Sequence, residues 1–189
     1  MKSIGGLVAV IVLSVGAQAF AADNYRVDPV HSSAVFRIKH ANVAPFWGRF
    51  NDPTGTFALD AADPSKSSFV IEIAVDKVNT GNAQRDNHLK SPDFFNARQY
   101  PKISFKSTSV KKGEGDNMLE VSGDLTMHGV TKPITAKVEL AGTGEFRGKA
   151  IAGVEATFTV KMTDFEIKGM PGALSDEVKV IVALEGGKQ

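Results

Sequence analysis

The residues of this sequence best suited to acid–base or metal chemistry are its four histidines and the carboxylates near them. Asp28 lies three residues before His31, and Asp86 lies two residues before His88. Imidazole and carboxylate groups bind zinc and exchange protons near neutral pH. No H-x-x-x-H pair is present, so a metal or acid–base site would have to assemble in the folded chain. We therefore predict structural hydrogen bonding, and no metal site or cofactor, for the set His31, His40, His88 and His128.

Nucleophilic catalysis has little support in the sequence. Ser32 beside His31, with Asp28 nearby, superficially resembles a catalytic triad. Residues so close together on one extended segment cannot readily form the relay that such a triad requires. The sequence also lacks the G-x-S-x-G, H-E-x-x-H and P-loop patterns. It contains no cysteine, which excludes disulfides, thiolate nucleophiles and iron–sulfur clusters.

Three polar residues, His40, Arg85 and His88, are candidates for the head-group end of a ligand or for the network that holds the barrel mouth. His40 shares its alternating face with Ile38, so it is either a hydrogen-bonded core residue or a donor aimed into an interior cavity. Arg85 either pairs with Asp86 or Asp28, or binds an anionic or carbonyl head group. The residue types alone leave both alternatives open.

Alternation of apolar and polar residues predicts β-strands along most of the chain. In residues 69–76, phenylalanine, isoleucine and valine occupy every second position, and acidic residues lie between some of them. Such strands have one buried and one solvated face, and about eight of them indicate an antiparallel barrel or sandwich in a single domain. The predicted strands include 36–40, 57–59, 69–75, 103–107, 119–127, 134–140, 156–162 and 178–184, with turns at 51–55, 112–117 and 142–144.

The alternation stops between residues 80 and 100, where a helical insertion is predicted. Ser91-Pro92-Asp93 reads as a helix N-cap, a proline at the first helical position and an acidic residue in the first turn. Residues 81–90 are expected to form another short helix. Phe94 and Phe95 offer apolar surface to the sheet beneath.

Charge and aromatic content narrow the range of partners. The chain has 22 Lys and Arg residues against 21 Asp and Glu residues, which is too balanced for backbone-driven nucleic-acid binding. It has 12 phenylalanines but only one tryptophan and two tyrosines, and most of the phenylalanines fall on the inward face. An interior walled by phenylalanine suits a slender apolar guest, and the alternative is a dry core that happens to be rich in phenylalanine.

The first 21 residues have the features of a signal peptide. Lys2 precedes the apolar stretch 7–15, and Ala19-Phe20-Ala21 matches a small-residue cleavage site. The apolar stretch is shorter than the roughly 20 residues of a membrane-spanning helix. We therefore expect cleavage after residue 21 and export of a mature domain that comprises residues 22–189.

Several motifs, in order along nearly the whole mature chain, resemble those of the YceI-like family. They are YRVDPVHS at 25–32, FRIKH at 36–40, RDNHLKSPDFF at 85–95, YPKISF at 100–105 and GDLTMHGVTK at 123–132. The resemblance implies an eight-stranded, lipocalin-like antiparallel barrel whose lumen binds polyisoprenoids or other long amphiphilic chains. It also implies export to the bacterial periplasm.

Together, pattern and resemblance predict an all-β barrel with a helical insertion around residues 81–98. The expected function is non-enzymatic binding of an isoprenoid quinone, a polyprenyl phosphate or a similar lipid. We expect transient membrane contact and either a monomer or a homodimer. Two alternatives are a histidine-dependent enzyme acting on such a lipid and a module that binds another protein. The predicted ligand-binding residues are Phe36, Ile38, His40, Phe69, Ile71, Arg85, His88, Phe94, Phe95, Phe105, Phe158 and Met162.

Overall fold

The computed structural model describes residues 22–189, so the predicted signal peptide lies outside the described residues. Among the described residues, no helix is long and apolar enough to cross a membrane. The strands are β1 (Asp23–Val27), β2 (Ser33–His40), β3 (Ala44–Asn51), β4 (Thr54–Leu59), β5 (Ser68–Ala74), β6 (Val78–Asn79), β7 (Lys102–Lys112), β8 (Met118–Met127), β9 (Val130–Phe146), β10 (Lys149–Lys161) and β11 (Glu177–Lys188). One α-helix, α1, spans Ala83–Leu89, and short 3-10 turns span Pro64–Lys66, Val75–Lys77 and Thr163–Phe165.

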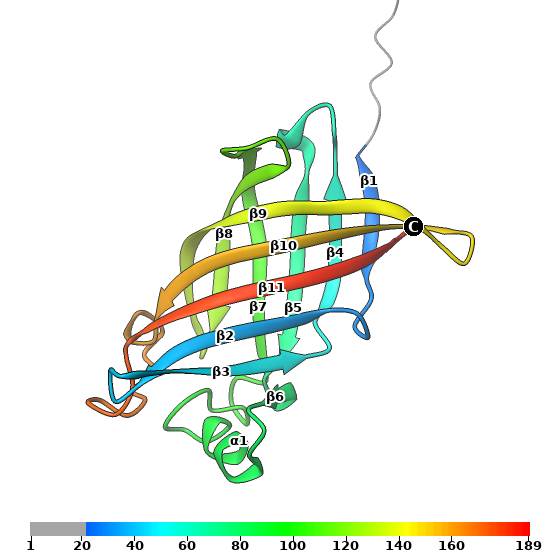
Figure 1. Cartoon of the computed structure of the whole chain (residues 1–189). Helices are drawn as coiled ribbons and strands as arrows, with labels where there is room; N and C mark the ends of the chain where they lie inside the picture. The colour runs from blue at the N-terminus through cyan, green and yellow to red at the C-terminus, as the bar shows by residue number, and fades with distance from the viewer. Residues whose placement is uncertain (1–21) are drawn as a thin grey trace, which may run out of the picture.

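The strands form a closed antiparallel barrel, which decides between the barrel and the sandwich. Pairing of β1 with both β4 and β11 closes a ring in the order β1-β4-β5-β7-β8-β9-β10-β11. β2 pairs with β11 beyond the end of β1, and β3 pairs with β2. The short strand β6 pairs with β3. Figure 1 shows β2, β3 and β9–β11 crossing in front of β4, β5, β7 and β8 at a steep angle. Closure of the ring pairs the edges that an open sheet would expose.

The predicted alternation positions the core. In β8, Leu119, Val121 and Leu125 are buried, whereas Glu120 and Asp124 are exposed. Successive side chains of a strand point to opposite faces, so each apolar residue at every second position enters the lumen. Burial of this surface contributes roughly 25 cal/mol per Å² of apolar area removed from water. The core is therefore the inner wall of the barrel itself.

The predicted turn at residues 142–144 is wrong, because these residues lie within β9. The chain reverses instead at Arg147 and Gly148, whose φ angles are 51° and 75°. Opposite the glycine-rich stretch, Gly153 pairs with Gly142 whereas Val154 pairs with Leu140, so one residue is left over in β9. Glycine weakens a regular strand but suits the local bend of such a bulge, which explains why the turn signal misled.

The insertion contains one helix where two were expected. The predicted helix in 81–90 is confirmed as α1, and its N-cap Asn82 accepts a hydrogen bond from the backbone N–H of Arg85 at 3.0 Å. The segment that follows Ser91 forms successive turns and not a second helix. The backbone N–H of Phe95 donates to the carbonyl of Leu89, the last residue of α1, at 3.0 Å, and that of Ala97 donates to the carbonyl of the C-cap Lys90 at 2.9 Å. The chain therefore folds back on α1, and this buries Phe94 against the barrel.

Candidate functional site

The barrel contains two apolar cavities. The outer chamber, next to α1, has a volume of about 160 Å³, and Arg85 is its only charged lining residue. The inner chamber has a volume of about 70 Å³, and Ser104 is the only polar residue in its lining. The alternation of the surrounding strands produces these walls, because every second side chain points inward. Such walls suit an apolar guest and offer few groups for chemistry.

The two chambers are adjacent, because they share part of their walls. Four residues from β5, β7, β10 and β11 line both of them, namely Ile73, Ile103, Phe158 and Val182. The aromatic ring of Phe158 is the largest of these side chains and is partly buried. A ligand that fills both chambers must therefore pass Phe158.

Ten of the twelve residues predicted to bind ligand line the lumen. The outer chamber includes Phe36, Ile38, Arg85, Phe94, Phe95, Phe158 and Met162. The inner chamber includes Phe69, Ile71 and Phe105, together with Phe158. The structure thus brings these residues to the interior of the barrel, whereas His40 and His88 line neither chamber.

His40 does not point into the lumen as its alternation with Ile38 suggested. It is the last residue of β2, and its side chain is exposed. Its backbone forms a β-bridge to Leu174 in the segment before β11. The barrel wall ends at this residue, so a side chain at an inward-facing position of the strand no longer points into the interior here.

His88 holds the insertion in place from outside the cavity. Its ring meets the ring of buried Phe94 edge-on, with the centroids 5.0 Å apart. Its Nε2 lies 3.3 Å from a carboxylate oxygen of Asp93. The two contacts link α1 to the turn that buries Phe94, which is a structural role.

His128 is likewise structural and forms part of the β8–β9 turn. It has a positive φ of 53°, and its Nδ1 lies 3.0 Å from the carbonyl oxygen of Phe165. The ring of Tyr100 packs against it at a centroid distance of 5.0 Å. Tyr100 also leaves no room for a side chain at Gly129, where a Cβ atom would lie 2.5 Å from the tyrosine ring.

Arg85 lies at the mouth of the outer chamber in a fixed orientation. Its Nε and Nη2 donate to the hydroxyl and carbonyl oxygens of Thr80 at 2.7 and 2.8 Å. Its guanidinium lies over the ring of Phe46, 4.3 Å from the centroid. The expected pair with Asp86 is indirect, because the Thr80 hydroxyl donates to that carboxylate at 2.6 Å. Within residues 22–189, Arg85 forms no direct ion pair, and the Thr80 hydroxyl lies between it and the Asp86 carboxylate.

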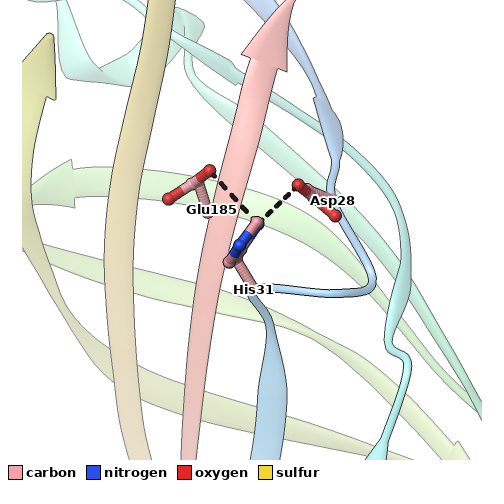
Figure 2. A group of neighbouring side chains, drawn as sticks. All are labelled: Asp28, His31 and Glu185. Atoms are coloured by element: carbon pink, nitrogen blue, oxygen red, sulfur yellow. Dashed lines mark hydrogen bonds and ion pairs between the residues drawn. The ribbon is translucent and has the colours of Figure 1, made fainter. Parts of the chain in front are cut away.

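A second polar cluster lies on the outside of the barrel, at the loop that joins β1 to β2 (Figure 2). His31 Nδ1 lies 2.8 Å from Asp28 Oδ2 and 3.7 Å from Glu185 Oε1. The hydrogen bond with Asp28 raises the pKa of His31, and the same bond lowers the pKa of Asp28. One imidazole and two carboxylates within 4.8 Å are also a donor set that could hold a divalent metal.

Ser32 is a structural residue and not a nucleophile. It is buried, and its Oγ accepts a hydrogen bond from the backbone N–H of Glu185 at 3.0 Å. His31 points toward Asp28 and Glu185 (Figure 2) and makes no hydrogen bond to Ser32. The triad-like order of the sequence therefore does not form a triad in space.

Sequence reasoning missed several residues of the site. Phe46 and Phe50 line the outer chamber from β3, whose alternation is interrupted by Gly48. The 46, 48, 50 spacing was the signal that could have identified this strand. Leu174 lies in a loop, and Glu185 meets His31 only because β11 runs beside the β1–β2 junction, so neither had a local signal.

Comparison with known proteins gives a consistent result. The model of the YceI-like domain matches residues 25–186. "Protein YceI" of Shigella flexneri is 41% identical over 192 aligned positions, covering 100% of this chain and 98% of the relative. The "UPF0312 protein" of Pseudomonas aeruginosa LESB58 is 40% identical over 191 positions, with the same coverage of both proteins.

Solved structures show the same barrel. BcnA of Burkholderia cenocepacia has a TM-score of 0.76 at 23% identity, covering 84% of this chain and 98% of that one. The YceI protein of Campylobacter jejuni has a TM-score of 0.71 at 28% identity, covering 80% and 90%. A polyisoprenoid-binding domain from Saccharophagus degradans has a TM-score of 0.67 at 18% identity, covering 87% and 98%. The first and third of these likenesses concern the fold alone.

Proposed function

This chain belongs to the YceI-like family, and on that premise we propose that it is an exported protein that holds a long-chain isoprenoid amphiphile in the barrel lumen. The lumen itself is the observation that carries the proposal. Two adjoining apolar chambers end at a mouth where Arg85 is the one charged lining residue. A structural relative described as a polyisoprenoid-binding domain supports the ligand class. The signal peptide predicted from residues 1–21 supports export to the periplasm.

The tail of the lipid would occupy the chambers. Transfer of a hydrocarbon tail from water contributes roughly 25 cal/mol per Å² of apolar area, so a long chain supplies a large driving force. Met127 and Met162 line the outer chamber. Their unbranched thioether side chains adapt to irregular shapes, which lets the wall adjust to a methyl-branched chain.

The head group would lie at Arg85. Thr80 and the ring of Phe46 fix the guanidinium without neutralising it, and its remaining N–H groups are available to a ligand. Guanidinium binds phosphate oxygens in charge-assisted hydrogen bonds and also donates to carbonyl oxygens. A polyprenyl phosphate and an isoprenoid quinone both fit this description. Carriage, storage and protection of the lipid are all consistent with such a site.

Native mass spectrometry of protein purified from its own periplasm tests the proposal. We expect a one-to-one adduct whose organic extract fragments as an isoprenoid. Delipidated protein should bind a polyprenyl phosphate at micromolar concentration, and Arg85→Gln should weaken that binding. Arg26→Gln on the outside of β1 is the matched control and should bind normally. A delipidated protein that binds no long-chain amphiphile would refute the proposal.

The alternative of a histidine-dependent enzyme receives no support from the described geometry. No histidine lines either chamber. The Asp28–His31–Glu185 cluster lies on the outer surface of the barrel, away from a lipid held in the lumen (Figure 2). Turnover of a bound lipid would therefore need a group other than these histidines.

A further inference from the structure

Three neighbouring strands carry a row of cationic and aromatic side chains on the outer surface of the barrel. Lys179 of β11 is paired with Arg37 of β2, and Arg37 is paired with Trp47 of β3. The alternation that points Phe36 and Val180 into the outer chamber turns these three residues outward. Lys39 continues the cationic face toward the end of β2, where Figure 1 shows β2 and β3 reaching the turn that joins them.

This arrangement is unfavourable for folding by itself. Like charges directly opposite each other on adjacent strands destabilise a sheet. Among the ion pairs within residues 22–189, none involves Arg37, Lys39 or Lys179. Basic and acidic residues are balanced over 22–189, with 21 of each once Lys2 is subtracted from the 22 in the full chain. Glu177, two residues before Lys179 on the same face of β11, is the single carboxylate of β2, β3 and residues 177–183. The cations of this face therefore outnumber its carboxylate, and an anionic partner would neutralise the excess.

Exposed apolar side chains lie beside the same face. Trp47 is 48% exposed, Val43 in the β2–β3 turn is 83% exposed, and Met170 is 47% exposed. The loop that carries Met170 is joined to this turn, because the N–H of Ala41 donates to the carbonyl of Ala173 at 2.7 Å. These residues lie close to the outer chamber, since Phe46 next to Trp47 and Leu174 in the loop of Met170 both line it.

We propose that this mouth face, defined as Arg37, Lys39, Val43, Trp47, Met170 and Lys179, docks on an anionic phospholipid bilayer. Basic residues close to such a surface each strengthen binding roughly fivefold. Tryptophan favours the headgroup region, and small exposed apolar side chains can enter the interface. The orientation would turn the mouth of the outer chamber toward the membrane, and in this respect the inference rests on the proposed function.

Vesicle flotation tests the docking. The probes are vesicles of phosphatidylcholine with or without phosphatidylglycerol, and they contain no isoprenoid. We expect binding only to the anionic vesicles, weakened by salt as surface electrostatics requires. Arg37→Glu combined with Lys179→Glu should lower the affinity by at least about tenfold. Failure of the unaltered protein to bind anionic vesicles would overturn the inference.

A matched variant separates this face from charge in general. Lys112→Glu combined with Lys149→Glu changes the net charge equally, at exposed turns distant from α1 (Figure 1). This control should keep its affinity within about twofold, because its residues lie beyond the range of close contact with the bilayer. An equal loss of affinity in both double variants would also overturn the inference. Thermal unfolding followed by circular dichroism identifies any variant that fails to fold.

Trp47 provides an internal reporter because it is the single tryptophan of the chain. Its emission should shift to shorter wavelength when anionic vesicles are added, since the ring enters a less polar region. Vesicle binding with unchanged Trp47 emission would show that another face docks. Loading of the lumen is measured separately by native mass spectrometry, so loss of docking with intact lipid binding would leave the proposed function standing.

Discussion

His31 is the residue at which ionisation and structure are most directly linked. The hydrogen bond to Asp28 raises the pKa of His31, so the folded protein keeps the imidazolium to higher pH than the unfolded chain does. Its contribution to stability is therefore present below the ordinary histidine pKa and is lost as pH rises through the raised value. The pKa of Asp28 is lowered by the same bond, so its contribution is lost as pH falls through that lowered value.

We predict that Asp28→Asn returns the pKa of His31 toward its ordinary value, because the carboxylate is the main cause of the shift. An NMR titration of the imidazole protons measures this change. Asp93→Asn, which alters the partner of His88 instead, should leave His31 unchanged. If His31 titrated identically in Asp28→Asn, a different group would be holding its proton. Resonance shifts on addition of Zn²⁺ would instead indicate a metal site at this cluster.

Ser32 is predicted to stabilise the barrel at the junction of β1 and β2. Its buried hydroxyl accepts the backbone N–H of Glu185, so Ser32→Ala leaves that donor without a partner. We expect a loss of about 1–3 kcal/mol in the free energy of unfolding, measured by urea titration. Ser33→Ala, one residue along β2, is the control and should cost less. Equal losses in the two variants would contradict this role for the Ser32 hydroxyl.

At the scale of the element, β3 shows how a strand accommodates a glycine that faces the interior. Gly48 of β3 is paired with Phe36 of β2, and a Cβ atom at Gly48 would lie only 2.2 Å from the ring of Phe36. The same device occurs at Gly186, where a Cβ would meet the ring of Phe57 at 2.6 Å. In each case an aromatic ring covers the space that a side chain would fill, from the adjacent strand β2 at Gly48 and from β4, on the far side of β1, at Gly186.

Gly48→Val should therefore push the Phe36 ring from its place in the wall of the outer chamber. We expect a loss of about 1–3 kcal/mol in stability, together with weaker lipid binding. Adding Phe36→Ala to Gly48→Val should recover part of the stability, because it removes the clash. The double-mutant cycle is measured by chemical unfolding. Additive effects of the two substitutions would show that the residues do not interact.

A comparison of β3 with other strands shows which parts of the fold were predictable from sequence. The alternation around Phe69 and Leu119 identified β5 and β8 as strands, because charged residues marked their outer faces. In β3, the alternation passes through Gly48, which has no side chain to mark the inner face. The insertion was located correctly, yet the turns after Ser91 depend on hydrogen bonds to the carbonyls of α1, which local capping rules do not contain.

The candidate site shows a similar division. Its apolar wall was predictable because strand parity places side chains such as Phe158 inside wherever the strand continues. His40 differs because β2 ends there. The alternation of side chains along a strand does not show where the strand, and with it the barrel wall, ends. The contacts of Arg85 with Thr80 and Phe46, and the approach of Glu185 to His31, join segments whose placement only the closed barrel determines.

At the scale of the whole molecule, Phe158 is the largest side chain that lines both chambers, so we expect it to limit the length of lumen open to the proposed ligand. On the proposed function, a short amphiphile would occupy the outer chamber alone, whereas a long tail would have to pass this ring to reach the inner chamber. Phe158→Ala should widen the passage and favour long tails over short ones. We expect the ratio of affinities to rise about tenfold, equivalent to roughly two further buried methylene groups.

Competition between a long and a short prenyl chain, followed by native mass spectrometry, measures that ratio. Phe36→Ala is the matched control, because Phe36 lines only the outer chamber and its removal makes room for both ligands. Phe158→Ala should cost no more than about 3 kcal/mol in stability, since the ring is only partly buried, so the barrel should remain folded. A ratio that rises equally in both variants would mean that total volume, and not the ring of Phe158, selects the tail. A ratio unchanged in Phe158→Ala would mean that long tails end in the outer chamber, and the inner chamber would then be a packing defect of the core.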